Sequence, residues 1–335
     1  MSSINVTFVK EAFIPGDTIQ GELLISTSIP FDITGIYLQL QGLERIRFRQ
    51  RADNTTNTST AENHEIDWEA KNGKTVNTGI PTILPISQPH FLQSVLICLT
   101  VPVTKHRGRL QIGLHSFPFT VALPSKLPPS LNFTSGSKYS AEIEYSLYFQ
   151  IFTGKSSANT PTLLHTSSLK VLHCPHRQSR FKHVFPFLDQ RITITHALCF
   201  CLSAKELNFF TKWDKNIFHP GQEAELILRL SLGHGSGTCN LKHVSVKLVR
   251  ELVLSVDGQS FRTVDPIAKS KFRVEGALLS DASSFELCTS THLQIPANLE
   301  PTTTTSSIDC RYFFVFEVDF KRFESILLAS EVIVQ

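Results

Sequence analysis

Two short segments of the sequence concentrate basic side chains. KHRGR contains Lys105, Arg107 and Arg109, and HRQSRFKH contains Arg177, Arg180 and Lys182. Guanidinium and ammonium groups at this density form charge-assisted hydrogen bonds with phosphates and carboxylates. They would therefore hold phosphorylated or acidic peptide tails, or the headgroups of anionic phospholipids. Ordinary solvated loop charge is the alternative interpretation of each cluster.

Histidine and cysteine are the next candidates for chemistry. Their densest group is His173, Cys174, His176 and His183. Pro175 separates two of these side chains in a segment without a regular pattern, so the sequence offers no fixed tetrahedral geometry for zinc. We interpret the group as part of a solvated linker, and we expect no metal and no cofactor.

Motifs of catalysis are missing from the sequence. It contains no Gly-x-Ser-x-Gly, no Walker loop, no His-Glu-x-x-His and no Gly-x-Gly-x-x-Gly after a strand. The GHGSG stretch at 233–237 lacks the lysine and the following helix of a phosphate-binding loop, so it predicts a hairpin tip. No catalytic residue is assigned, and an enzyme is not expected.

Composition narrows the class of protein. A net charge of +3 provides no general attraction to nucleic acid. The start of the chain lacks the basic region and apolar core of a signal peptide, and the longest apolar run, 91–103, is too short to span a membrane. The seven cysteines are scattered and form no Cys-x-x-Cys pair, which argues against a disulfide framework. These features predict a cytoplasmic protein.

Strict alternation of apolar and polar residues predicts β-strands throughout. Apolar residues recur at every second position in GIYLQLQGL, EIEYSLYF, AELILRLS, VSVKLV and FFVFEVDF. Half-buried strands separated by Pro, Gly and Asn turns are typical of β-sandwiches with one wet face. The polar stretch at 50–80 indicates a long surface insertion. A short helix near 91–98 is the one helical expectation.

The order of these features repeats within the chain. In each half a Pro-Gly pair (Pro15–Gly16 and Pro220–Gly221) precedes a long strand, and each Pro-Gly is expected to form a type II turn. Another alternating strand, a Pro-rich turn and an aromatic strand follow in both halves. The chain therefore predicts an all-β protein of two tandem immunoglobulin-like sandwiches. We place them at 1–175 and 190–335, with a linker at 173–190.

The motifs in these halves resemble those of arrestin-domain proteins, and most closely the α-arrestins. In the first half the similar residues are Pro15, Gly16, Asp17 and Gly21, followed by GLHSFPFTVALPSKLPPS with Gly113, His115, Phe117, Pro118, Phe119, Leu123, Pro124, Leu127, Pro128 and Ser130. In the second half they are Pro220, Gly221, Gln222, Ile295, Pro296, Pro301, Thr302, Tyr312 and Phe313. The resemblance covers residues 4 to 334. Gln222 stands where the family usually has an acid.

The resemblance implies an adaptor that binds cytoplasmic segments of membrane cargo for endocytic or endosomal sorting, in association with the plasma membrane or endosomes. Implied partners are cargo or receptor tails, a ubiquitin ligase or sorting-coat components, and anionic lipid. Lys10 lies near the position where related arrestins sense phosphate. Many α-arrestins bind ubiquitin ligases through a Pro-Pro-x-Tyr tail, but this sequence contains no such motif.

Two other functions stay open. A retromer-type arrestin-like subunit would bind a large scaffold stably, and it would purify as a stoichiometric complex. A secreted adhesion sandwich would use the glycosylation sequons, of which those at Asn54 and Asn132 are the ones to examine.

Overall fold

The computed structural model describes residues 3–49, 89–104, 107–136, 138–153, 161, 163–172, 185–194, 205–233, 238–274, 278–280 and 286–335. In these ranges every regular element is a β-strand, which confirms the predicted all-β class. The predicted helix near 91–98 is wrong, because these residues form part of a long strand. The predicted insertion at 50–80 and the GHGSG tip fall mainly or wholly outside the described residues.

The first sandwich contains two sheets. Its strands are β1 (Ser3–Phe8), β2 (Ala12–Phe13), β3 (Thr18–Thr27), β4 (Phe31–Arg49), β5 (Pro89–Thr104), β6 (Gly108–Leu110), β7 (Gly113–Ala122), β8 (Leu131–Ser135), β9 (Tyr139–Thr153) and β10 (Leu163–Val171). The small sheet has the order β1-β3-β7. The large sheet has the order β2-β10-β9-β4-β5, with β6 paired to β4 and β8 paired to β9.

The second sandwich repeats this topology. Its strands are β11 (Phe187–Ile194), β12 (Lys205–Trp213), β13 (Ile217–Phe218), β14 (Glu223–Leu232), β15 (Thr238–Val256), β16 (Gln259–Phe272), β17 (Leu278–Ser280), β18 (Leu287–Gln294), β19 (Thr303–Thr304), β20 (Ile308–Phe320) and β21 (Ile326–Val334). The small sheet has the order β11-β12-β14-β18. The large sheet has the order β13-β21-β20-β15-β16, position for position like the first.

Alternation along the strands builds the core, as the sequence predicts. In β4 the side chains of Ile36, Leu38 and Leu40 are fully buried, while the residues between them face outward. In β20 the even-numbered aromatic residues Phe314 and Phe316 are likewise fully buried, and Val315 between them is also buried. Because successive side chains point to opposite faces of a sheet, one run of apolar residues fills each sandwich.

Both Pro-Gly pairs form the expected type II turns. Gly16 has φ 87° and Gly221 has φ 84°, values that favour glycine. The Asp17 amide donates to the Ile14 carbonyl at 3.0 Å, and the Gln222 amide repeats this bond in the second sandwich at 3.1 Å. Gln222 also replaces the acid in function, because its Oε1 accepts from the His219 amide as Asp17 Oδ2 accepts from Ile14.

Other residues of the sequence motif fix the ends of the sheets. The Ser130 hydroxyl accepts from the Val171 amide at 2.9 Å, and Thr302 accepts from Val334 at the same distance. These bonds hold the segment after each Pro-rich turn against the last strand of its sandwich. The motif residues that repeat in these bonds therefore have structural roles in both sandwiches.

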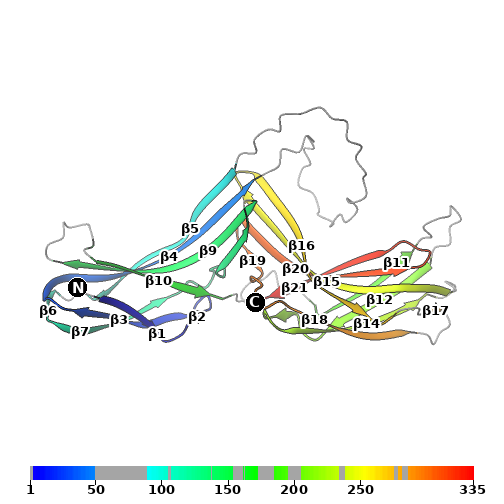
Figure 1. The fold of residues 1–335 in the computed structure, drawn as a ribbon, viewed down its shortest axis with the longest axis horizontal. Coiled ribbons are helices and arrows are strands. Elements are labelled where there is room, and N and C mark those ends of the chain that lie inside the picture. The colour runs from blue at the N-terminus through cyan, green and yellow to red at the C-terminus, as the bar shows by residue number, and fades with distance from the viewer. Residues whose placement is uncertain are drawn as a thin grey trace, which may run out of the picture.

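The two sandwiches lie side by side, and their large sheets rise toward each other. Figure 1 shows β4, β5 and β9 from one side and β15, β16 and β20 from the other reaching a shared crest. The small sheets lie away from this crest, and β6 lies at the outer end of the first sandwich. The crest therefore brings together residues that are far apart in the sequence.

Candidate interaction surfaces

Lys10 is exposed, and its ammonium group lies 3.4 Å from Asp17 Oδ2 in the first Pro-Gly turn. Lys215 occupies the equivalent place in the second sandwich, where it donates to Gln222 Oε1 at 3.4 Å. In both cases the lysine precedes its partner by seven residues. The repetition indicates that Lys10 supports the turn, whatever it binds in addition.

The structure does not bring Arg107 and Arg109 to Lys10. Arg107 and Arg109 are exposed beside β6, where Arg109 is paired in register with Asp32 of β4. Figure 1 places β6 and the short strand β2, which follows Lys10, at opposite ends of the first sandwich. Lys105, Arg177, Arg180 and Lys182 lie outside the described residues, as do His173, Cys174, His176 and His183.

A polar joint between the two sandwiches was not predicted. Glu44 of β4 has an exposed fraction of 1%. Its carboxylate accepts from the Ser94 hydroxyl of β5 at 3.0 Å and from the Thr305 hydroxyl of the second sandwich at 2.5 Å. The sequence does contain a signal for it, because Glu44 shares strand parity with Leu40 and therefore faces inward.

Arg250 of β15 forms a second contact across the joint. Its guanidinium lies 4.6 Å from the ring centroid of Phe133 in β8, and it donates to Asp265 of β16 at 2.9 Å. Such cation–π contacts are strongest where water is excluded. Stacked rings extend the joint, since Phe261 of β16 lies 5.9 Å from Phe48. The joint therefore combines charge and apolar packing.

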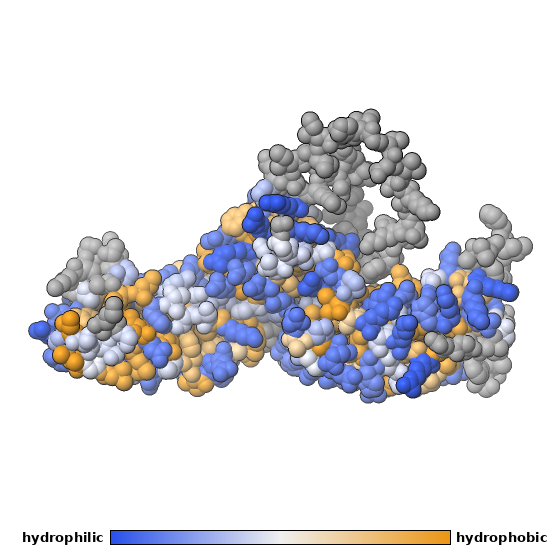
Figure 2. Space-filling model, in the orientation of Figure 1, coloured by the Kyte–Doolittle hydropathy of each residue, from blue (hydrophilic) through white to orange (hydrophobic). Residues whose placement is uncertain are grey.

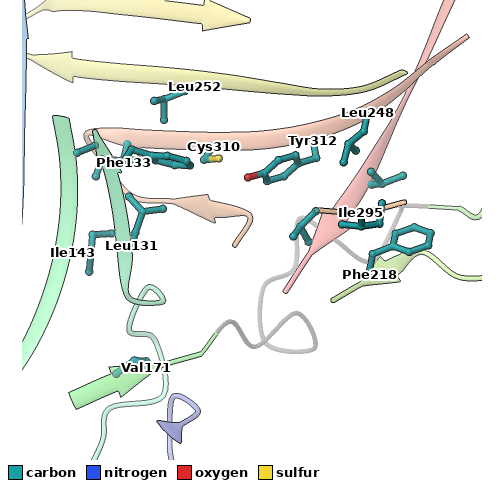
Figure 3. Packing of buried hydrophobic residues seen from close by; sticks show 14 of the residues in the cluster. Leu131, Phe133, Ile143, Val171, Phe218, Leu248, Leu252, Ile295, Cys310 and Tyr312 are labelled. Atoms are coloured by element: carbon teal, nitrogen blue, oxygen red, sulfur yellow. The ribbon is translucent and has the colours of Figure 1, made fainter. Parts of the chain in front are cut away.

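Figure 3 shows the apolar part of this joint, with Phe133 beside Cys310 and Tyr312 of β20. Burial raises the pKa of the Cys310 thiol to about 12, and burial also raises the pKa of Tyr312. The Tyr312 hydroxyl donates to the Glu300 carbonyl oxygen at 2.8 Å. Burial raises the pKa of the Glu300 carboxyl despite its hydrogen bond from the Asn132 backbone. The side chains of Cys310 and Tyr312 are shielded from water and serve packing, while Glu300 is half-buried.

The outer face of the first large sheet carries amide and aromatic side chains. Gln150 Nε2 donates to Gln39 Oε1 at 2.9 Å, and Gln39 Nε2 donates to the Cys98 sulfur at 3.0 Å. The rings of Tyr37 and Phe152 meet edge to face at 5.6 Å. This neutral part of the face lies away from the crest, and the charged residues Arg45, Glu142 and Glu144 share the same face nearer the crest.

The outer face of the second large sheet carries a ladder of ions. Glu317 of β20 lies 2.9 Å from Lys247 of β15 and 3.6 Å from Lys269 of β16, and Ser245 donates to it at 3.2 Å. Burial alone would raise the pKa of the Glu317 carboxyl, but the hydrogen bond and the charge of Lys247 with that of Lys269 lower it. The ladder spans adjacent strands and stabilises the sheet face.

A hollow of about 470 Å³ lies at the crest end of the first large sheet. Its lining includes Arg45 and Arg47 of β4, Phe91 of β5, and Thr134 and Glu142. Arg45 is held by Glu142 and by Glu144 at 3.2 and 2.9 Å. Arg47 is exposed and has no ion-pair partner in the part of the chain that the structure describes.

Side chains that could ligate a metal are dispersed over the described ranges. No group of three or more His, Cys, Asp or Glu residues suited to a metal ion occurs there. Within the same ranges no helix has the length and apolar character needed to cross a bilayer.

Tandem seven-strand sheets joined through a buried polar contact define a two-domain β-sandwich protein of the arrestin architecture. Comparison with protein families agrees. Residues 3–151 match the model "Arrestin (or S-antigen), N-terminal domain", and residues 203–335 match "Arrestin (or S-antigen), C-terminal domain". The chain belongs to the arrestin-domain family.

A curated relative is similar over part of its length. "Arrestin domain-containing protein A" of Dictyostelium discoideum is 28% identical over 119 residues, which make up 36% of this chain. The matched part is only 17% of that protein. The likeness therefore supports the assignment to the arrestin-domain family. The activity of that longer protein is not transferred to this chain.

Proposed function

We propose that the protein is a non-enzymatic adaptor of the α-arrestin type, which binds cytoplasmic segments of membrane cargo for endocytic or endosomal sorting. The observation that carries the proposal is the family match over both sandwiches. The joint supports it, because a buried carboxylate and a cation–π contact hold two exposed sheet faces at a shared crest. Such a platform can bind cargo and a second partner together.

The second partner in this proposal is a ubiquitin ligase or a sorting-coat component. The adaptor acts in the cytoplasm and associates peripherally with the plasma membrane or endosomes. Phosphorylated or acidic cargo tails and anionic lipid headgroups are the ligands for the candidate basic residues, of which Lys10, Arg107 and Arg109 lie in the described part of the chain.

Proximity labelling in the native cell tests the adaptor function. The expected result is enrichment of membrane proteins together with ligase or coat components. A list that lacks all three classes would contradict the proposal.

The basic cluster needs its own variant. Changing Lys105, Arg107 and Arg109 together to Ala is expected to weaken the capture of acidic cargo or anionic vesicles. The matched control changes Lys212, Lys242 and Arg273, which are exposed basic residues of the second sandwich, and removes the same charge. Equal loss in both variants would assign the effect to net charge and remove the specific role of the cluster.

A further inference from the structure

The edge strands β5 and β16 occupy equivalent positions in the two large sheets, yet only β16 contains charged residues. The sequence of β16, QSFRTVDPIAKSKF, contains Arg262, Asp265, Lys269 and Lys271, with Pro266 between them. Charges and proline are the usual means by which natural proteins prevent an edge strand from pairing with another chain. The second sandwich therefore has a guarded edge.

β5 has none of these charged guards, and its two prolines, Pro89 and Pro102, stand near its ends and leave residues 90–101 free of proline. Its sequence of 16 residues, PHFLQSVLICLTVPVT, contains no Asp, Glu, Lys or Arg. Phe91 and Val95 are 61% and 60% exposed, and Leu99 is 38% exposed. Its hydrogen-bonded neighbour is β4, and no other described strand pairs with its far edge. A long uncharged edge with exposed apolar side chains is suited to strand addition.

Apolar residues are also unevenly distributed on the surface. On the face that Figure 2 shows, apolar colour is more extensive over the first sandwich than over the second. Most of the exposed large apolar side chains in the described ranges belong to the first sandwich, and β16 contributes only Val264. The difference between the two edges is therefore part of a wider difference in surface chemistry.

We propose that the free edge of β5 binds an extended segment of a partner protein by strand addition. The inference rests on the proposed adaptor function and names the binding edge. The segment has small apolar residues at alternate positions, which pack beside Phe91 and Val95. Its backbone supplies the hydrogen bonds that β5 lacks on its outer side.

Charge next to the edge defines the partner further. Arg47 lies opposite Phe91 in the register of β4 and β5, and Arg49 lies opposite Pro89. Both arginines are exposed, and neither has an ion-pair partner among the residues described. Arg47 and Phe91 also line the hollow of about 470 Å³. The partner segment therefore carries acidic residues at the end that reaches the crest.

The test uses the purified full chain and a synthetic peptide, Asp-Asp-Thr-Val-Thr-Val-Ser-Val, with hydrogen exchange as the readout. Binding is expected to protect the amides of β5 and to leave those of β16 unchanged. Cys98, an exposed residue of β5, is expected to react more slowly with a maleimide when peptide is bound. Cys288, exposed on β18, is the internal control and keeps its rate.

Two altered peptides separate the contributions of backbone and charge. A peptide N-methylated at alternate residues cannot donate along one edge and is expected to lose binding. A peptide that begins with Lys-Lys is expected to bind at least about fivefold more weakly, which corresponds to about 1 kcal/mol. Unchanged affinity of the methylated peptide would exclude strand addition.

Matched protein variants place the site. Val95→Lys adds one charge to an exposed position of β5 and is expected to weaken binding at least about fivefold. Val264→Lys adds the same charge to β16 and is expected to have no effect. Equal affinities for both variants, or a dimer of the protein that the peptide disrupts, would overturn the proposal. Failure of the peptide to bind would remove this site, while the labelling experiment tests the adaptor function separately.

Discussion

The joint between the sandwiches offers a measurable coupling energy. Thr305 and Glu44 are 261 residues apart in sequence, and the hydrogen bond between their side chains at 2.5 Å crosses from one sandwich to the other. Glu44 is 1% exposed, so water cannot readily reach its carboxylate to replace a hydrogen-bond donor that is removed. We expect Thr305→Val to lower the free energy of unfolding, and Thr305→Ser to lower it much less.

The magnitude follows from the bonds that are lost. A hydrogen bond to a charged group contributes about 1.5–3 kcal/mol and a neutral one about 0.5–1.5 kcal/mol. The Thr305 hydroxyl also accepts from the amides of Ser307 and Ile308, at 3.1 and 2.8 Å. Thr305→Val therefore also removes these hydrogen bonds within the local turn. A double-mutant cycle that combines Thr305→Val with Glu44→Gln cancels the contribution of these turn hydrogen bonds. Because Gln keeps a neutral acceptor, the coupling energy should be about 1–2 kcal/mol.

Urea unfolding followed by tryptophan fluorescence measures the cycle. The chain has two tryptophans, so a Trp68→Phe background reports on Trp213, which is buried in the second sandwich. A substitution of Glu44 in the first sandwich should therefore alter the unfolding transition reported by Trp213 in the second sandwich. Ser306→Ala, at an exposed neighbouring residue, is the control. A coupling energy below about 0.5 kcal/mol, which is the range found for independent sites, would refute the energetic coupling across the joint.

Two further changes test the fold. Gly21→Ala places a Cβ against the Thr7 carbonyl oxygen and 2.6 Å from the Phe119 ring, and it should lower the free energy of unfolding in urea by about 1–3 kcal/mol. Gly35→Ala, whose nearest contact is the Tyr37 ring at 3.1 Å, should cost less, and equal costs would contradict the crowding at Gly21. Glu317→Gln should destabilise the protein at neutral pH. The pKa of Glu317 is lowered in the folded state, so its ionised carboxylate stabilises the fold at pH values above 4.5, the ordinary pKa. This contribution is lost as the pH falls through the lowered pKa. Urea unfolding at pH 7 and at acid pH measures the difference, and a difference that does not depend on pH would rule out the ion pair with Lys247 as its source.

Alternation predicted the strands well because the inner faces of both sandwiches are continuous. It failed at β5, where the register shifts between Gly42 and Leu43 of the partner strand. Such a bulge adds one residue and breaks the period of two, and here both Leu96 and Ile97 are half-buried. Two adjacent apolar residues in a short run resemble one turn of a helix. The misassignment thus has a local cause.

The joint could be predicted only in part. Glu44 and Arg250 directly follow the predicted strands GIYLQLQGL and VSVKLV and continue their inward parity, between Gly42 and Ile46 and between Leu248 and Leu252. A charged residue at such a position predicts a buried polar partner. The identity of that partner could not be predicted, since it depends on how the sandwiches pack.

The internal repeat helps to distinguish architecture from binding chemistry. Where the halves make the same bonds, as at Ser130 and Thr302, one fold is simply built twice. Where the equivalent strands β5 and β16 differ, the fold does not require the difference, and a function of one half explains it better. Ser94 connects this difference to the joint, because it belongs to β5 and donates to Glu44, which in turn accepts from Thr305. A segment added to the edge of β5 would lie one strand away from the contact that holds the two sandwiches together.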